Sequence, residues 1–439
     1  MKHISYLLLA VIVCMTACRN HTGKTINDIL TKDTIDGDVV ALQSALRADN
    51  TRFGVTLHSY EFHRIFDTPA PKGYKPFYIS HYGRHGSRSD WGKTAYMNVK
   101  NVLEEAKQKG VLTGKGEVLL SKTDSILLLY NGMDGRLTDR GEREHARLAE
   151  RMYYRFRPVF KSNNGQPILI QSIASRVPRC IISMAAFTNS LTSLNQHIGY
   201  NFDTGDRMQE YIDCCKPESD RMKANIRRIQ DSLMAQLPFD STFVLEALFS
   251  DTKDLQLPNL KDFQRDIFNT CAVAQDYDIA LNVLDYMAFE TAYYWQMNAT
   301  YTIVLRTCNI VGISDERIPN AQIAVNELVE KADAAIADGI YVADLRFGHD
   351  YPLVYFVNRL GISGVGEQLL PGEIEQRWWA HRNITMASNL QVIFYRSDKS
   401  EEILVKVLYN EVERRIIGLE PISGPYYRWA DVRAKWCNN

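Results

Sequence analysis

The chain has 439 residues, of which 45% are hydrophobic and 23% are charged, and its 25 glycines and 14 prolines are typical of a globular protein. This composition excludes disordered, fibrous and disulfide-scaffold proteins and predicts two or three structural units with substantial cores. The 51 basic and 52 acidic residues nearly cancel, so no global field would attract nucleic acid or an anionic membrane surface, and a local cluster must hold any bound anion.

The first residues have the pattern of an export signal. Lys2-His3 precedes an apolar run over Ile4–Val13, which is too short to span a bilayer and has the length of a signal-peptide core. The run ends in Met15-Thr16-Ala17-Cys18, which resembles the lipobox of bacterial lipoproteins. We therefore expect residues 1–17 to be a signal peptide and the exported protein to be periplasmic or at the cell surface, lipid-anchored to a bacterial membrane through Cys18. The alternative is an ordinary secretory signal in which Cys18 is a bystander.

Six further cysteines follow the predicted signal and Cys18. None of them has the Cys-x-x-Cys or Cys/His spacing of a zinc site, so the sequence predicts no metal centre. An oxidising compartment would permit disulfides in 15 complete pairings, and the sequence does not choose among them. The six are Cys180, Cys214, Cys215, Cys271, Cys308 and Cys437.

The predicted elements follow one another in the order of an α/β protein. Residues 18–45 are polar and predict a tether that leads into a first helix. A helix is predicted from its N-cap, Thr138, to about Phe156, because apolar residues recur there on one face. Three short apolar runs, each followed by a break and a helical segment, predict buried parallel strands at Phe77–Ser80, Ile168–Ile170 and Ile340–Leu345.

The composition changes between residues 192 and 300, where strand-like runs disappear. Helical lengths at Arg221–Leu237 and Tyr277–Ala299 predict that residues 192–300 form a mainly α-helical insert. The α/β domain is then discontinuous and consists of residues 46–191 and 301–439.

The segment Ser80–Arg88 follows the first predicted strand and carries Arg84, His85 and Arg88 on the turn that leaves the strand end. Ligands of α/β sheets bind at such turns. Guanidinium groups offer a planar fork to phosphate oxygens, and a neutral imidazole nitrogen can attack phosphorus. A surface turn is the simpler interpretation of this segment alone, so its assignment depends on the rest of the chain.

Two later turns carry matching chemistry. Pro178 suits the first position of a helix, which puts Arg179 in the first turn beside free backbone N–H groups. His349 and Asp350 follow the third predicted strand and precede a helix that should stop at Gly361. A bound phosphate dianion would help Asp350 keep a proton, which it could deliver to a leaving alkoxide. Each cluster alone is explained by a helix cap or a solvated side chain, whereas together they predict a phosphate-ester site.

The three clusters resemble the histidine phosphatase superfamily, in particular its histidine acid phosphatase branch, which includes phytases and multiple inositol polyphosphate phosphatases. That family carries Arg-His-Gly-x-Arg, a distal arginine before a Ser-x-x-x-Phe helix, and a late His-Asp pair. The matching residues are Arg84–Arg88, Arg179 before Ser183–Phe187, and His349-Asp350. Leu137–Glu142 and Met386–Ile393 extend the resemblance over nearly all of the mature chain.

The resemblance implies a phosphoglycerate mutase-like α/β fold, with a mostly parallel sheet flanked by helices and a helical cap. It also implies a hydrolase that needs no metal or cofactor and removes phosphate from monoesters, most notably inositol polyphosphates such as phytate. In that family scheme His85 would form a phosphohistidine, and Asp350 would protonate the leaving group and then activate water. The residues that would hold the phosphate are Arg84, Arg88, Arg179 and His349.

Two departures from the family pattern bear on substrate choice. Asp90 stands where the family usually has proline, and His349-Asp350-Tyr351 stands where animal-type inositol polyphosphate phosphatases have His-Ala-Glu. A broad-specificity histidine acid phosphatase for small phosphate esters is therefore one alternative. A non-catalytic lipoprotein that binds phosphate esters is another, although a pure binder would not need both His85 and Asp350. Nucleic acid is not an expected partner, because basic patches are absent from the sequence.

Overall fold

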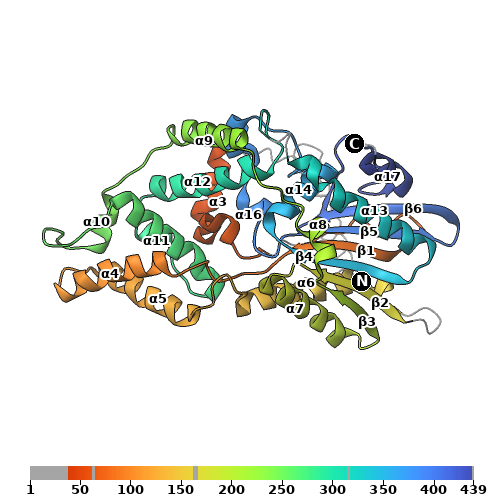
Figure 1. Cartoon of the computed structure of the whole chain (residues 1–439), viewed down its shortest axis with the longest axis horizontal. Coiled ribbons are helices and arrows are strands. Elements are labelled where there is room, and N and C mark those ends of the chain that lie inside the picture. Colours follow the sequence, from red (N-terminus) through yellow and green to blue (C-terminus); the bar gives the residue numbers. More distant parts are fainter. Residues whose placement is uncertain (1–37, 62–64, 162–166, 314–316, 438–439) are drawn as a thin grey trace, which may run out of the picture.

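A central eight-stranded sheet organises the molecule (Figure 1). The computed structural model describes residues 38–61, 65–161, 167–313 and 317–437, so the predicted signal peptide, Cys18 and most of the predicted tether lie outside the described residues. The strand order is β3-β2-β4-β1-β5-β6-β7, and β8 pairs with β6. The strands are β1 (Tyr74–Arg84), β2 (Ile168–Ala174), β3 (Ile198–Asp203), β4 (Tyr341–Gly348), β5 (Asn389–Ser397), β6 (Ser400–Tyr409), β7 (Val412–Arg414) and β8 (Tyr427–Arg428).

One half of the sheet is parallel and the other half is antiparallel. β3, β2, β4 and β1 run parallel to one another, whereas β5 pairs antiparallel with β1 and β6. β6 also pairs antiparallel with β7 and β8. The predicted α/β class and the three predicted strands are confirmed, since those strands form the cores of β1, β2 and β4. The expectation of a mostly parallel sheet holds only for the four-stranded half.

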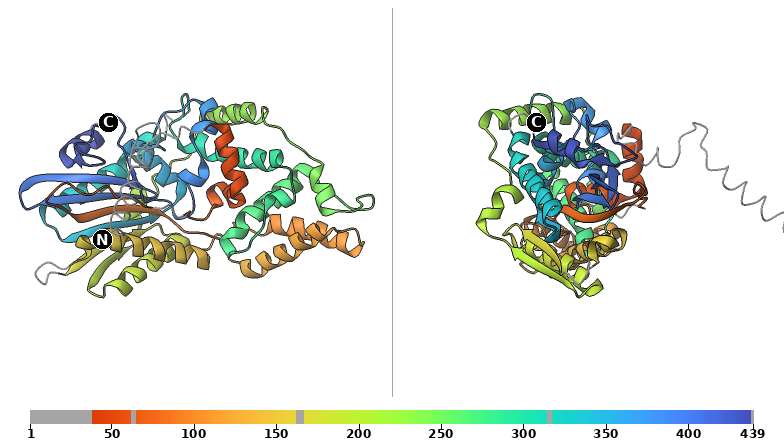
Figure 2. Two further views of the ribbon diagram at one scale, coloured as in Figure 1. Left: turned by 180° about the vertical axis from the view of Figure 1, so that it is seen from behind. Right: turned by 90° about the vertical axis from the view of Figure 1, so that its right-hand side faces the viewer.

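Helices cover both faces of the sheet (Figures 1 and 2). On one face Tyr78 and Tyr82 of β1 belong to the same core as α13 (Gln322–Ala337), α14 (Asp350–Leu360) and α17 (Trp429–Cys437). On the other face Ile79 packs in a second core with α6 (Asp139–Arg155) and α7 (Pro178–Leu194). Side chains alternate between the two faces because consecutive strand residues point in opposite directions.

The local signals at the helix ends behave as the sequence predicts. Thr138 is the N-cap of α6, and its hydroxyl accepts a hydrogen bond from the Gly141 N–H. Pro178 is the first residue of α7. Gly361 ends α14 in the left-handed region at φ +66°, where glycine has no steric penalty. These signals fix where the polypeptide leaves β1, β2 and β4 and where the next helix starts.

A group of helices lies at the end of the molecule away from the sheet (Figures 1 and 2). α4 packs on α5 and α11, and α12 packs on α9. No helix within the described ranges is long and apolar enough to cross a membrane. The group consists of α3 (Val39–Ala48), α4 (Thr94–Gln108), α5 (Gly114–Tyr130), α9 (Asp220–Met234), α10 (Phe243–Leu248), α11 (Leu260–Ala274) and α12 (Phe289–Thr307), and the remaining short helices are α8 (Asp206–Ile212), α15 (Ile374–Arg377) and α16 (Ala380–Asn383).

The helical group differs from the predicted insert at residues 192–300. α4 and α5 come from the segment predicted to be α/β, yet they pack with α11 and α10 of the predicted insert. β3 lies inside the predicted insert, yet it pairs with β2 at the edge of the sheet. It escapes detection because an edge strand that is half exposed lacks the continuous apolar run of a buried strand.

Two helical predictions also need correction. The segment Tyr277–Ala299 is not one helix, because α12 begins only at Phe289 and short 3-10 turns precede it. Residues 39–45, assigned to the tether, are the first part of α3, and the buried side chain of Leu42 holds that helix against the core. The prediction over Arg221–Leu237 corresponds to α9.

Candidate active site

Six residues singled out by the sequence lie together at the carboxyl ends of β1, β2 and β4. Arg84 Nη2 is 2.9 Å from Asp350 Oδ2, and Arg179 Nη2 is 3.1 Å from His349 Nδ1. The rings of His85 and His349 have their centroids 5.7 Å apart. Arg88 completes the group, because its guanidinium carbon and that of Arg179 lie 4.9 and 4.6 Å from the centroid of the same Trp91 ring, and its charge acts on His85. Three guanidinium groups thus surround one imidazole.

The main chain holds His85 from three directions. Its N–H donates to the Gly348 carbonyl at 2.9 Å, and its own carbonyl accepts from the Ala387 N–H at 3.0 Å. Nδ1 is 2.9 Å from the Gly86 carbonyl oxygen, which can only accept, so Nδ1 carries the proton and Nε2 has a free lone pair. Burial, reinforced by the charges of the three arginines, lowers the pKa of His85 well below its usual value. The imidazole is therefore neutral over a wide pH range.

Arg84 is the most deeply buried of the three arginines, with 1% of its surface exposed. Its Nη1 donates to the main-chain carbonyls of Thr56 at 2.7 Å and Thr385 at 3.0 Å. Burial lowers the pKa of its guanidinium, while the Asp350 carboxylate opposes this effect. The Nε groups of Arg84, Arg88 and Arg179 are all buried without a hydrogen-bond acceptor among the described residues. Buried donors normally have partners, so these Nε groups are unpaired polar groups of the site, whereas the outer guanidinium nitrogens are the ones that can meet a ligand.

The N-terminus of α14 presents the His349-Asp350 pair. His349 is the N-cap and Asp350 is the first helical residue. Because Arg179 can only donate, His349 Nδ1 accepts from it, and Nε2–H then donates to Ser175 Oγ at 3.1 Å. Burial and the charge of Arg179 lower the pKa of His349 to about 4. In this arrangement His349 contacts Arg179 and Ser175 with both ring nitrogens.

Asp350 is ionised in this site. Burial raises the pKa of its carboxyl group, but the charge of Arg84 and the hydrogen bond from the Tyr351 N–H outweigh burial, so the pKa lies below the usual value. That N–H donates to Asp350 Oδ1 at 2.9 Å. The carboxylate is partly exposed, at 25% of its side-chain surface, and can therefore meet a ligand.

Glu144, which the sequence analysis did not single out, and Ser183 of the Ser-x-x-x-Phe motif hold the loop after β1. Glu144 of α6 accepts from the Ser87 N–H at 2.7 Å, from the Ser87 hydroxyl at 2.9 Å and from the Tyr60 N–H at 2.9 Å. Ser183 Oγ of α7 accepts from the Gly86 N–H at 3.2 Å. Glu144 shares the buried face of α6 with Leu148, and an acidic residue on an apolar helix face is the signal that identifies it.

Close backbone packing explains the glycine after His85. A Cβ atom on Gly86 would lie 2.5 Å from the Gly141 carbonyl oxygen. A Cβ atom on Gly141 would in turn lie 2.3 Å from the Ser87 carbonyl oxygen. Only two glycines allow the start of α6 to approach the loop this closely, which brings Glu144 under Ser87.

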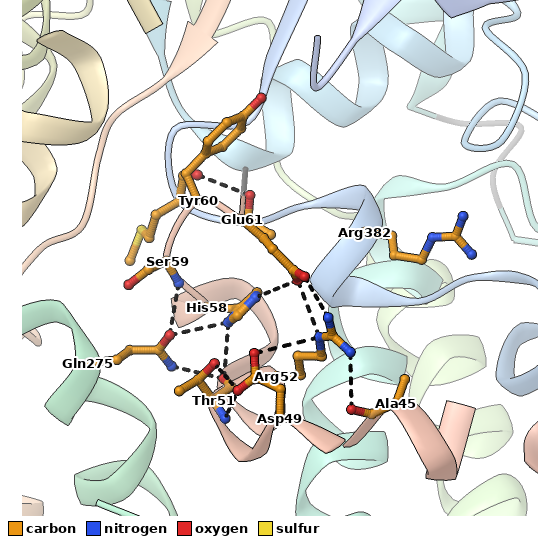
Figure 3. Close-up of polar contacts among 12 residues, drawn as sticks. Ala45, Asp49, Thr51, Arg52, His58, Ser59, Tyr60, Glu61, Gln275 and Arg382 are labelled. Atoms are coloured by element: carbon orange, nitrogen blue, oxygen red, sulfur yellow. Dashed lines mark hydrogen bonds and ion pairs between the residues drawn. The ribbon is translucent and has the colours of Figure 1, made fainter. Parts of the chain in front are cut away.

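A polar network holds the segment whose Thr56 carbonyl accepts from Arg84. Figure 3 shows the part of this network around His58 and Glu61. His58 Nδ1 lies 3.1 Å from the Thr51 carbonyl oxygen and 3.2 Å from Gln275 Oε1, and His58 Nε2 lies 3.3 Å from Glu61 Oε2. The hydrogen bond from His58, aided by Arg52 and opposed by burial, lowers the pKa of Glu61. This network fixes the 3-10 segment Asn50–Leu57, which contains Thr56.

Other histidine, arginine and cysteine side chains are not among the predicted site residues and have contacts of their own. His81 is buried, and its ring packs against Phe187 and Phe347. Arg176 is exposed and pairs with Asp206. The six later cysteines are free thiols. Within the described ranges no cluster of three or more histidine, cysteine or acidic side chains is arranged to hold a metal ion.

The chain was compared with known proteins. No family model matches it. The multiple inositol polyphosphate phosphatase of Bifidobacterium longum, solved with inositol hexasulfate, has a TM-score of 0.68 at 18% identity and aligns over 87% of this chain and 97% of that chain. The phytase from D. castellii has a TM-score of 0.64 at 13% identity, over 88% and 85%. The Hafnia alvei phytase with myo-inositol hexakis sulphate has a TM-score of 0.51 at 11% identity, over 84% and 98%. The chain therefore has the fold of the multiple inositol polyphosphate phosphatases and phytases, as its resemblance to the histidine acid phosphatase branch implies.

Proposed function

We propose that this protein is a phosphomonoesterase that transfers the phosphoryl group of its substrate to His85 and then to water. The observation that carries the proposal is the state of His85. Its Nδ1–H is fixed on the Gly86 carbonyl, its Nε2 lone pair is free, and three arginines surround it. A neutral nucleophile among cationic groups suits attack on an anionic phosphate ester.

In the first step the Nε2 lone pair of His85 forms a bond to phosphorus while the bond from phosphorus to the ester oxygen breaks. Arg84, Arg88 and Arg179 bind the phosphoryl oxygens and stabilise the charge that spreads over them in the transition state. Asp350 gives its proton to the departing alkoxide. Because the carboxyl is ionised in the free protein, the substrate dianion must first offset the charge of Arg84 and so raise the pKa of Asp350.

In the second step water hydrolyses the phosphohistidine. The Asp350 carboxylate takes a proton from water, the water oxygen bonds to phosphorus, and the bond between nitrogen and phosphorus breaks with its electron pair returning to His85. Inorganic phosphate leaves. Asp350 acts as an acid in the first step and as a base in the second, so the proton that it loses is restored at the end of the cycle. The residues themselves supply every group, and no metal or cofactor takes part in the proposed steps.

Inositol polyphosphates such as phytate are the proposed substrates. The multiple inositol polyphosphate phosphatase and the phytases with this fold support the choice. In the free protein His349 orients Arg179, to which it is hydrogen-bonded, and its implied contact with phosphate requires Nε2 to exchange Ser175 for the ligand.

The test is release of inorganic phosphate from phytate and from an aryl phosphate, in the presence of a chelator, by the wild type and by His85→Ala. Release from phytate that survives the chelator and disappears in the variant is the expected result. Release from the aryl ester alone would move the substrate to small phosphomonoesters. If neither ester is hydrolysed although inorganic phosphate binds, the protein is a phosphate-ester-binding lipoprotein instead of an enzyme.

We also propose that the protein is exported and lipid-anchored through Cys18, on the strength of the sequence Met15–Cys18. The expected result is incorporation of a labelled fatty acid by the wild type and none by Cys18→Ser. Cleavage of the signal without incorporation in the wild type would establish secretion without an anchor.

A further inference from the structure

Trp91 lies against two of the site arginines. The guanidinium carbon of Arg179 is 4.6 Å from the centroid of the indole ring, and that of Arg88 is 4.9 Å from it. Yet 61% of the Trp91 surface is exposed, which is unusual for so large an aromatic side chain. An exposed indole that touches two buried cations at a reaction centre calls for an explanation beyond core packing.

Neither arginine is held by an acidic partner. Among the described residues no carboxylate lies within ion-pair distance of Arg88 or Arg179, whereas Arg84 pairs with Asp350. Arg88 Nη1 donates to the Ser89 carbonyl at 2.7 Å, and Arg179 Nη2 contacts His349, but the Nε groups of both have no acceptor among the described residues. Something other than an ion pair must therefore orient the two guanidinium planes.

An aromatic face orients a guanidinium without competing for its hydrogen-bond donors. The contact uses the face of the cation, so the N–H groups on its edge stay available to phosphate oxygens. A carboxylate in the same place would occupy those N–H groups and repel the phosphate. Resting on the proposed function, we propose that Trp91 is a positioning residue that holds Arg88 and Arg179 with their N–H groups directed at the phosphate.

Hydrogen bonds and close packing against Gly135 fix the loop that carries Trp91. The Trp91 N–H donates to Asp90 Oδ1 at 2.8 Å, and the Asp90 carbonyl accepts from the Gly135 N–H at 2.8 Å. The indole ring rests on Gly135, where a Cβ atom would lie 2.8 Å from ring atom Cζ3. Asp90, which stands where the family usually has proline, thus ties the loop to the segment that supports the ring.

The experiment compares Trp91→Leu with Trp91→Phe. Calorimetric titration with inorganic phosphate measures affinity without turnover, and kcat/KM is measured on an aryl phosphate. Leucine keeps apolar bulk but has no π face, so we expect about tenfold weaker phosphate binding, or about 1.4 kcal/mol, with a similar loss in kcat/KM. Phenylalanine should restore most of both quantities.

Two further variants keep the result interpretable. Gly135→Ala should displace the indole without removing it, and because Gly135 has φ +61° it also strains the loop that carries the ring, so it should weaken phosphate binding in the same direction. Tyr154→Leu removes another exposed aromatic ring, near the C-terminal end of α6, that lies 5.4 Å from the guanidinium carbon of Arg157, and it should change neither quantity.

Several outcomes would overturn the proposal. An unchanged phosphate affinity in Trp91→Leu would contradict it. If in addition only KM for the ester rises, the indole contacts the organic part of the substrate and does not position the arginines. Equal losses in the leucine and phenylalanine variants would also contradict a role for the π face. If the wild type itself binds no phosphate, the proposed function fails, and the proposal for Trp91 fails with it.

Discussion

The two halves of the sheet contribute to the site in different ways. The parallel half supplies side chains: Arg84 ends β1 and His85 follows it, Ser175 follows β2, and His349 and Asp350 follow β4. The antiparallel half supplies main-chain groups. The turn before β5 offers the Thr385 carbonyl to the Arg84 side chain, the Ser388 carbonyl to the Arg84 N–H, and the Ala387 N–H to the His85 carbonyl.

The difference follows from strand direction. Parallel strands all end at the same edge of a sheet, so helices start there and direct their N-termini and loop side chains at one point. β5 runs the other way and begins at that edge, so the turn that precedes it meets the site with its backbone. The antiparallel half therefore acts as a brace for reactive side chains that the parallel half carries.

The largest effect on activity is expected from a substitution in the parallel half. Asp350→Asn removes the group that exchanges the proton in the proposed mechanism, so kcat should fall by about 10²–10⁴-fold. The loss should be greater for phytate than for an aryl phosphate, because an alkoxide needs protonation more than a stabilised phenolate does. Steady-state kinetics on both esters check this, and an equal small loss on both would remove Asp350 from the acid role.

The second prediction is that a substitution in the antiparallel half lowers stability but leaves activity nearly unchanged. Lys406 of β6 is 1% exposed and lies 3.0 Å from Asp67 and 2.9 Å from Glu413. Lys406→Met leaves the buried Glu413 carboxylate without this cation, so the free energy of unfolding should fall by about 3 kcal/mol while kcat changes less than about twofold.

Denaturant unfolding and kinetics measure both quantities for Lys406→Met. The double variant Lys406→Met with Glu413→Gln should recover part of the stability, because it removes the uncompensated charge. A large loss of kcat in a folded Lys406→Met protein would show that the antiparallel half does more than brace the site.

The third effect tests the brace directly. Ala387 is buried and has φ +53°, in the left-handed region that β-branched residues avoid. Ala387→Val should cost about 1–3 kcal/mol in stability and lower kcat/KM about tenfold, since its N–H holds His85 and its neighbours hold Arg84. Ala387→Gly fits the same backbone and is the matched control. Equal activity in the two variants would mean that the turn does not position the site.

Local signals made much of the fold and site predictable. Thr138, Pro178 and Gly361 act on the residues beside them, so a single sequence suffices to place the starts of α6 and α7 and the end of α14. The six site residues carry distinctive chemistry on turns after strands. Their convergence could be predicted because parallel strands end at one edge.

Long-range features could not be predicted in this way. The packing of α4 and α5 against α10 and α11 joins distant parts of the chain, and no local pattern announces it. β3 is a half-exposed edge strand without a continuous apolar run. The carbonyls of Thr56 and Thr385 hold Arg84, but every residue has a carbonyl, so the sequence cannot single them out.

The smallest expected effect concerns acid stability beneath the parallel half. His145 of α6 is fully buried, its ring packs against Phe187 and Phe347, and burial lowers its pKa to about 3. Above pH 6.5 it is neutral in both the folded and the unfolded state. As the pH falls from 6.5 towards 3 only the unfolded state takes up the proton, so stability is lost over this window by up to about 1.4 kcal/mol per pH unit.

His145→Phe should therefore lose about 2 kcal/mol less stability than the wild type between pH 7 and pH 5, measured by denaturant unfolding at each pH. The exposed His197 provides the control, and His197→Gln should keep the wild-type dependence. The pKa of Lys406 shifts in the opposite direction, because the charges of Asp67 and Glu413 raise it by more than burial lowers it. The lysine therefore stays charged between pH 7 and pH 5. If His145→Phe keeps the full wild-type loss between pH 7 and pH 5, the acid sensitivity in this range does not originate at this histidine.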